Sequence, residues 1–118
     1  MLENDLFSIL KMDRADGEIV SEVSINATHP IYKGHFPGSP VTPGVILLQM
    51  VKAVMQNHLQ RDPRLNAIKT CKFLEILNPD KTKSFNIKIS FKQLERLEVV
   101  ATGYSADVVF FKLQATYH

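Results

Sequence analysis

The sequence predicts an α+β protein in which an antiparallel sheet of five to six strands wraps around one long central helix. The stretch Val45–Met55 is apolar except for Gln49 and Lys52, and such a helix needs to be covered on most sides. Ser84–Lys92 alternates apolar and polar residues with a period of two, which is typical of a half-buried strand. Because such strands flank a single apolar helix, we expect the sheet to bury one face against it.

Length and composition limit the possible functions. A chain of 118 residues is long enough for one core, so we expect a single domain spanning residues 1–118. The net charge of +2 is too small for a nucleic-acid-binding surface. A single cysteine, Cys71, excludes an intramolecular disulfide and a cysteine-based zinc site. We expect Cys71 to pack inertly in a strand.

The sequence gives no sign of export or membrane insertion. Glu3 and Asp5 interrupt the apolar residues at the start, and a signal peptide lacks such charges there. The apolar run Val45–Leu48 is far shorter than the roughly 20 residues that a membrane-spanning helix needs. We therefore expect a cytoplasmic protein that does not contact a membrane.

The first two strands form a hairpin. Leu6–Arg14 and Glu18–Ile25 flank the turn sequence Asp16-Gly17, which is a strong short-range hairpin signal. In the second of these runs Ile19, Val23 and Ile25 share one face, and Ser21 interrupts that apolar face. Later strands are expected at Ala67–Leu77, Ser84–Lys92, Arg96–Tyr104 and Val108–Tyr117. In the last strand the apolar residues expected on one face are Val109, Phe111, Leu113, Ala115 and Tyr117.

The helix is expected from about Thr42 to Gln60. Thr42 suits the N-cap, where its hydroxyl would accept from a free backbone N–H. Pro43 suits the first helical position, because its missing N–H costs nothing there. Pro63 lies just beyond the expected end and cannot continue a helix.

The segment before and within this helix resembles a known signature. Residues 34–49 read GHFPGSPVTPGVILLQ, which is similar to the signature of the 3-hydroxyacyl-[acyl-carrier-protein] dehydratases of hotdog fold. That signature comprises a GHFPG loop, a PVMPG turn and a helix with an acidic residue five positions after the last glycine. The present sequence departs from it twice, with Thr42 in place of methionine and Gln49 in place of the acid.

The resemblance implies a role for each matching residue. His35 would remove the C2 proton of the substrate, a task suited to a histidine near neutral pH. The backbone carbonyl of Val41 would fix the His35 tautomer, and the N–H of Gly44 would stabilise the thioester oxygen. Gln49 occupies the position of the acid that protonates the departing hydroxyl. Two further residues, Phe36 and Pro43, would contact substrate.

The implied reaction converts a 3-hydroxyacyl thioester to a trans-2-enoyl thioester in fatty-acid or polyketide-like biosynthesis. The substrate would arrive on the phosphopantetheine of an acyl carrier protein, and no metal or redox cofactor is implied. Because carrier proteins are acidic, docking would use lysines near the motif or after the helix. The candidates are Lys33, Lys69, Lys72, Lys81 and Lys83.

Gln49 leaves three interpretations open, because an amide can bind a hydroxyl but cannot cycle a proton at neutral pH. The chain is a working dehydratase in which His35 makes both proton transfers, a non-catalytic partner of a protomer that supplies the carboxylate, or an acyl- or carrier-binding protein without turnover. Dimers of the resembled family combine the histidine of one protomer with the acid of the other, so we expect a homodimer or a heterodimer. In that geometry Gln49 is buried and faces His35 of the neighbouring protomer. A hotdog thioesterase also needs an acid, which makes that class a weaker alternative.

Overall fold

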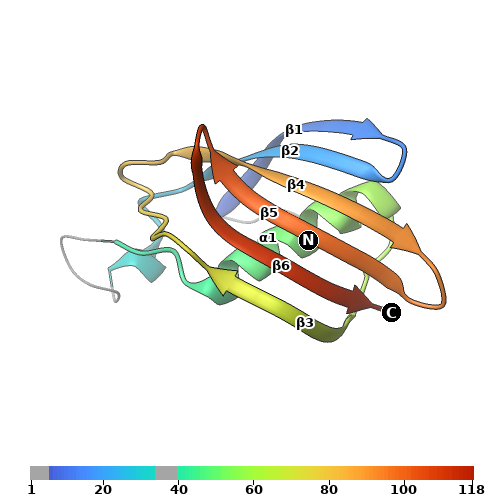
Figure 1. Ribbon diagram of the computed structural model, residues 1–118. Helices are drawn as coiled ribbons and strands as arrows, with labels where there is room; N and C mark the ends of the chain where they lie inside the picture. Colours follow the sequence, from blue (N-terminus) through green and yellow to red (C-terminus); the bar gives the residue numbers. More distant parts are fainter. Residues whose placement is uncertain (1–5, 34–39) are drawn as a thin grey trace.

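The computed structural model describes residues 6–33 and 40–118, in which one helix packs against one face of a six-stranded sheet (Figure 1). The helix α1 spans Gly44–Leu59 and a short 3₁₀ turn, η1, spans Pro30–Tyr32. The strands are β1 (Phe7–Ala15), β2 (Glu18–Ile25), β3 (Leu65–Phe73), β4 (Ser84–Gln93), β5 (Leu97–Ser105) and β6 (Val108–Tyr117). Their order in the sheet is β1-β2-β4-β5-β6-β3, and every neighbouring pair is antiparallel. The predicted α+β arrangement, with a sheet curled around a central helix, is confirmed.

The hairpin of β1 and β2 forms at the predicted turn. Ala15 pairs with Glu18, so Asp16 and Gly17 make a two-residue connection. Gly17 has a φ of 70°, a conformation that glycine adopts without steric cost. The Asp-Gly sequence therefore fixes the register of the first two strands.

The core lies between α1 and the inner face of the sheet. Met50, Val51, Val54 and Met55 of the helix are fully buried. The sheet contributes alternating residues from its central strands, among them Ile19, Val23, Ile87, Ile89, Leu97, Val99, Ala101 and Leu113. The predicted alternation in β4 is confirmed, since Phe85, Ile87 and Ile89 are all buried.

Ser21 does not break the apolar face of β2 as its polarity suggests. It is fully buried, and its hydroxyl donates to the backbone carbonyl of Lys11 on β1 at 2.9 Å. A buried hydroxyl with a partner avoids the desolvation cost of an unsatisfied one. The residue therefore cross-links the edge of the hairpin without disturbing the core.

Strand β6 contains one extra residue opposite β5. The register pairs Phe111 with Gly103 and Val109 with Tyr104, so Phe110 has no direct partner. This bulge interrupts the alternation expected between Val109 and Phe111, and it buries two consecutive aromatic rings. The Phe110 ring meets Phe85 edge-on, with 5.9 Å between the ring centroids.

The start of α1 differs from the prediction. The N-cap is Pro43, with an extended ψ of 146°, and no side chain caps the helix. The carbonyl of Pro43 accepts from the N–H of Ile46, which starts the helix at Gly44 rather than at Pro43. Thr42 is not the N-cap because its hydroxyl is engaged elsewhere, with the phenol of Tyr32. At the other end, Gln60 closes the helix in a left-handed conformation, as expected for a helix ending near that residue.

Strand β3 begins and ends earlier than expected. The prediction was Ala67–Leu77, and the strand spans Leu65–Phe73. After Phe73 the chain leaves the sheet, because the N–H groups of Leu74 and Glu75 both point to the carbonyl of Phe110. Leu77 then accepts from the N–H of Thr42, which ties this connection to the start of α1.

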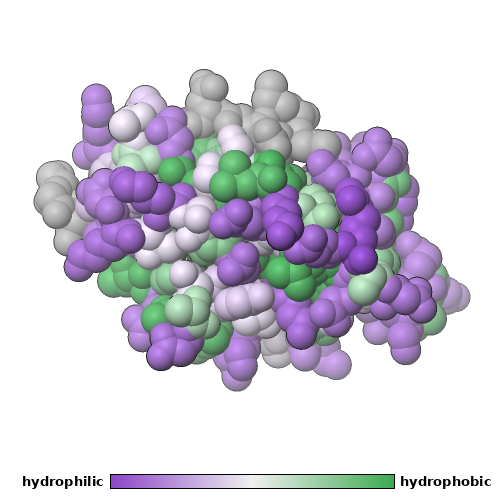
Figure 2. All heavy atoms as spheres, turned by 90° about the horizontal axis from the view of Figure 1, so that it is seen from above, coloured by the Kyte–Doolittle hydropathy of each residue, from purple (hydrophilic) through white to green (hydrophobic). Residues whose placement is uncertain are grey.

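Apolar surface is not confined to the interior. The face in Figure 2 mixes hydrophilic residues with several separate hydrophobic areas. The large exposed apolar residues include Val45 on α1 and Leu65, Ile68 and Phe73 on β3. No helix in the described ranges is long and apolar enough to cross a membrane.

The fit between Gly103 and Phe111 gives a test of this packing. A Cβ atom added at Gly103 would overlap the ring of Phe111, which is fully buried in the core. We expect Gly103→Ala to lower the free energy of unfolding by about 1–3 kcal/mol, the usual cost of overpacking. Urea denaturation measures it, with Thr102→Ala on the same strand as the control. Equal stability of the two variants would show that the ring is not held in place.

Candidate functional site

A cavity of about 510 Å³ opens at the start of α1. Three of the predicted site residues line it together, namely Val41, Pro43 and Gly44. The opposite wall comes from the end of β3 and the connection that follows it, residues 73–77. This volume lies in the range of small-molecule sites. The structure thus brings the turn before the helix into one hollow with the segment after β3.

Gly44 is the first residue of the helix, so its N–H has no intrahelical acceptor and lies at the positive end of the helix dipole. The ring of Phe73 covers its α-carbon: a Cβ placed on Gly44 would lie 2.5 Å from Cζ of that ring. A side chain at position 44 would therefore require the ring of Phe73 to move. Phe73 is 54% exposed, so its ring is held on one side only.

A buried pair of hydroxyl groups supports the turn that carries Val41 and Pro43. The phenol of Tyr32 and the hydroxyl of Thr42 lie 3.0 Å apart, and both residues are buried. Burial raises the pKa of the Tyr32 phenol above its ordinary value, and the hydrogen bond with Thr42 offsets part of that rise. Tyr32 lies in η1, so the pair joins the chain before the predicted catalytic loop to the chain after it.

Gln49 lies elsewhere in the single chain. It lines a smaller, almost entirely apolar hollow of about 190 Å³ on the flank of α1 that faces β3. The residue is exposed, whereas burial was expected. The prediction assumed that the helix is covered on most sides, but along this flank Val45 is also exposed and Lys52 pairs with Asp62 at 3.2 Å. In one chain, therefore, Gln49 and Gly44 do not share a cavity.

The predicted base and one predicted substrate contact lie outside the described residues. His35 and Phe36 belong to positions 34–39, so their roles stay predictions. The described chain resumes at Pro40, immediately before Val41. In the sequence, the segment that contains His35 thus directly precedes the turn that lines the cavity.

Several cavity residues were not found from the sequence. The sequence analysis assigned no role to Tyr32, Phe73 or Glu75. Their placement depends on the connection after β3 folding back to the helix start, where Leu77 accepts from Thr42. No local pattern predicts such a long-range contact. Cys71, by contrast, behaves as expected, because partial burial raises the pKa of its thiol and so disfavours the reactive thiolate.

Comparison with known proteins identifies a family. A family model described as ApeI-like, ApeI dehydratase, matches residues 11–106. The chain is 29% identical over 116 residues to the 3-hydroxyacyl-[acyl-carrier-protein] dehydratase FabZ of Fusobacterium nucleatum, covering 92% of this chain and 81% of the relative. It is 30% identical over 107 residues to the FabZ of Geobacter metallireducens, covering 88% and 68%.

The fold also matches a solved structure. The dehydratase heterocomplex ApeI:P from Xenorhabdus doucetiae contains a chain that superposes with a TM-score of 0.75 at 20% identity, covering 93% of this chain and 96% of that one. At this level of identity the match concerns the fold, and it confirms the predicted hotdog arrangement.

The Tyr32–Thr42 pair can be tested with a double-mutant cycle. Tyr32→Phe and Thr42→Val each leave one hydroxyl buried without its partner, so each should lower the free energy of unfolding by about 1–3 kcal/mol. The double variant removes both polar groups and should cost clearly less than the sum of the single changes. Urea denaturation of the four proteins gives the coupling. Additive costs would contradict a direct bond between the two hydroxyls.

Proposed function

Because the chain belongs to the ApeI-like family of dehydratases, we propose that it takes part in the dehydration of a 3-hydroxyacyl thioester, carried on an acyl carrier protein, to a trans-2-enoyl thioester. The pathway would be fatty-acid or polyketide-like biosynthesis. The observation that carries this proposal is the cavity at the start of α1, where Gly44 presents a helix N-terminus beside Val41 and Pro43.

The chemistry needs a group that stabilises negative charge on the thioester oxygen as the C2 proton leaves. The N–H of Gly44 supports this role, since a helix N-terminus offers donors and partial positive charge without any reorganisation. The mixed walls of the cavity suit the substrate: Leu47, Phe73 and Ile76 offer apolar contacts to the acyl and pantetheine groups. Glu75 is the one charged residue in this lining.

His35 is the base in this proposal. It would remove the C2 proton, and the carbonyl of Val41 would accept from its second ring nitrogen and so hold the tautomer. The hydroxyl at C3 leaves as water once it has received a proton. The reaction requires a base, an oxygen-stabilising donor and an acid, and none of these steps calls for a metal or a redox cofactor.

The residue at position 49 decides whether this chain itself supplies the acid that protonates the departing hydroxyl. Its amide can hold the departing hydroxyl by hydrogen bonds, but it cannot give up a proton. General acid–base assistance contributes about 10²–10⁴-fold in rate. A pair of identical chains therefore has two sites that combine His35 with Gln49, and such sites would turn over slowly.

A second candidate function is that of a partner protomer. Gln49 and its hollow lie on the open flank of α1 beside β3, which is where a second hotdog protomer would bring its own residues to the site. The structurally similar chain from Xenorhabdus doucetiae is described as part of the dehydratase heterocomplex ApeI:P. In this function the chain contributes His35 and Gly44, and the partner contributes the carboxylate.

Substitution at Gly44 tests the cavity. A methyl group there meets the ring of Phe73, which is half exposed and can move, so Gly44→Ala should fold with a stability close to that of the wild type. Turnover should fall at least about tenfold, because the displaced ring and the methyl group narrow the approach to the N–H. Steady-state kinetics on one 3-hydroxyacyl thioester measure the effect, and Gln56→Ala, on the same helix but outside the cavity lining, serves as the control. Unchanged turnover would remove Gly44 from the site.

Substitution at Gln49 tests the missing acid. Because Gln49 is exposed in the single chain, Gln49→Glu should fold normally. We expect it to raise dehydratase turnover at least several-fold, within the range that general acid–base assistance provides. Wild type, Gln49→Glu, Gln49→Ala and His35→Ala are compared on the same substrate.

The four proteins separate the two candidate functions. A wild type with measurable turnover that is lost in His35→Ala indicates an enzyme that works without a carboxylate. A wild type without turnover, together with an active Gln49→Glu, indicates a partner protomer. If Gln49→Glu is no faster and Gln49→Ala is unimpaired, position 49 takes no part in the chemistry.

A further inference from the structure

Thr42 is held at its backbone, at its side chain and by the residue that follows it. Its backbone N–H donates to the carbonyl of Leu77 at 2.9 Å, and its hydroxyl lies 3.0 Å from the phenol of Tyr32. Pro43 comes next, and a residue before proline is restricted to extended backbone conformations. Only 4% of Thr42 is exposed. Because its backbone and its side chain are both bound, Thr42 can change orientation only if these bonds break.

The bond to Leu77 also fixes the peptide group that joins Val41 to Thr42. This group is planar and, like every peptide bond of the described residues, trans, so its N–H and its carbonyl point in opposite directions. Because the N–H points to Leu77, the carbonyl of Val41 points away from that residue. No backbone N–H of the described residues binds this carbonyl. It is therefore an acceptor of fixed direction on a residue that lines the cavity.

Tyr32 is anchored to the sheet through a series of turns. Its backbone N–H donates to the carbonyl of His29 at 3.1 Å, and the N–H of His29 donates to the carbonyl of Asn26 at 3.1 Å. Asn26 directly follows β2, and its N–H donates to the carbonyl of Leu6, directly before β1, at 2.9 Å. Burial raises the pKa of the Tyr32 phenol, so the phenol keeps its proton for the bond with Thr42. The phenol is thus held in place from the open end of the first hairpin.

The bond between the two hydroxyls also gives a physical meaning to the departure from the dehydratase signature at position 42. Methionine is usual there, and its thioether sulfur is at most a weak acceptor for the phenol of Tyr32. In the present chain the same position is fixed by a hydrogen bond in addition to packing.

We propose that Tyr32 and Thr42 are positioning residues for the reaction. Their hydroxyl pair, together with the bond from Thr42 to Leu77, keeps the turn of residues 41–44 in the orientation that the reaction uses. This inference rests on the proposed function, in which the Val41 carbonyl holds the base and the Gly44 N–H binds the thioester oxygen. Neither hydroxyl takes part in a proton transfer, and both act through the backbone of the turn.

The alternative is that the pair only stabilises the fold. The double variant Tyr32→Phe/Thr42→Val separates the two roles. It removes both hydroxyls together, so neither is left buried without its partner, and valine keeps the branched shape of threonine. Most of the stability is thereby retained, although the bond that holds the Thr42 side chain is lost.

Steady-state kinetics on one 3-hydroxyacyl thioester, measured where every variant is fully folded, give the first readout. The kcat of the double variant should fall at least about tenfold, because a displacement of about 1 Å can cost about 10²-fold in rate. KM should change little, since the walls of the cavity remain in place. Thr42→Ser keeps a hydroxyl beside Tyr32 and should retain most of the wild-type kcat, whereas Thr42→Val should not. A pair that only stabilises the fold predicts the wild-type kcat for all of them.

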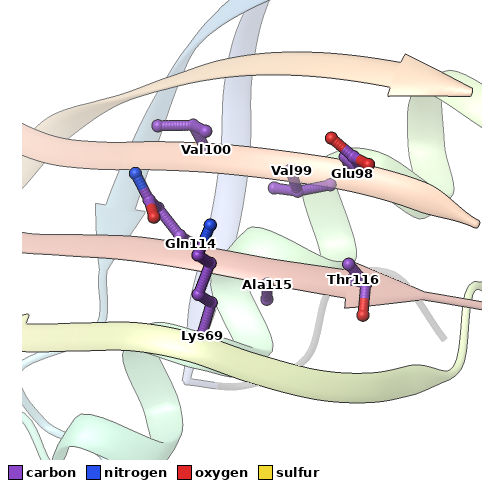
Figure 3. A pocket seen from close by; sticks show the side chains of 7 residues that line it. All are labelled: Lys69, Glu98, Val99, Val100, Gln114, Ala115 and Thr116. Atoms are coloured by element: carbon purple, nitrogen blue, oxygen red, sulfur yellow. The ribbon is translucent and has the colours of Figure 1, made fainter.

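Two control variants remove a hydroxyl elsewhere. Thr116→Val makes the same chemical change in the trough of Figure 3, on the face of the sheet turned away from α1, where the Thr116 hydroxyl accepts from Asn66 at 2.9 Å. Ser21→Ala removes a fully buried hydroxyl that donates to the carbonyl of Lys11. Neither residue lines the cavity at the start of α1. Both variants should therefore keep the wild-type kcat even where they lose stability.

Hydrogen exchange of the backbone amides, followed by NMR, tests the inference without any substrate. The N–H of Thr42 is protected only while its bond to Leu77 persists. In the double variant its exchange rate should rise at least about tenfold more than that of the Ala101 amide in the centre of the sheet, which reports general loss of stability. In Ser21→Ala the exchange rate of Thr42 should rise no more than that of Ala101.

The two readouts separate failure of this inference from failure of the proposed function. An active wild type whose kcat is unchanged in the double variant overturns the inference and keeps the reaction, and so does a Thr42→Ser variant as slow as Thr42→Val. Exchange at Thr42 that rises no more than at Ala101 in the double variant overturns it as well. A wild type without turnover removes the proposed function, and a local rise of exchange at Thr42 then still supports the hold of the hydroxyl pair on this turn.

Discussion

The width of the sheet relative to its single helix is the constraint on which the rest of the structure depends. Six strands spaced about 4.7–4.9 Å apart make a sheet roughly 25 Å wide, whereas a helix with its side chains is about 10–12 Å across. One helix therefore cannot cover the whole inner face, even of a curled sheet. Met50, Val51, Val54 and Met55 fill the centre, and the two flanks of the helix need other cover.

The start of the helix and its flank beside β3 are covered differently. The connection after β3 covers the start of the helix, because it reaches back so that the carbonyl of Leu77 accepts from the N–H of Thr42. The hollow between these segments is the candidate site at Gly44. The flank beside β3 is not covered by the described part of the chain, and there Val45, Gln49, Leu65 and Ile68 are exposed. The same geometric limit thus produces both the cavity and the incomplete surface.

Local sequence patterns predicted the structure correctly wherever a residue's environment is set by its near neighbours in the sequence. The alternation in Ser84–Lys92 and the Asp16-Gly17 turn predicted β4 and the first hairpin, because side-chain periodicity and turn geometry act over a few residues. The resemblance in residues 34–49 implied the hotdog fold, an antiparallel sheet wrapped around one helix, but not the order of the strands in the sheet. All of these are short-range or family-level signals, and together they account for most of the fold.

Environments set by distant contacts could not be predicted in this way. Thr42 has the right chemistry for an N-cap, but Tyr32 offers a buried partner that the linear sequence does not place beside it. The bulge at Phe110 arises from pairing with β5, and it buries a ring that simple alternation assigns to the surface. Gln49 was expected to be buried because its neighbours are apolar. That argument assumes that one chain supplies all the cover, and the width of the sheet rules this out.

The exposure of Gln49 changes how its replacement of an acid is understood. The desolvation cost of a buried carboxylate would have to be offset by other groups of the same chain. For a residue on an open flank, that cost arises only when a partner covers it. Under the proposed function, an amide at position 49 removes a proton donor from a site built by two identical chains. Such a site would be completed by a partner that differs from this chain and carries a carboxylate at the corresponding position. Whether the chain works alone or with such a partner therefore depends on a residue that lies on the open flank of α1.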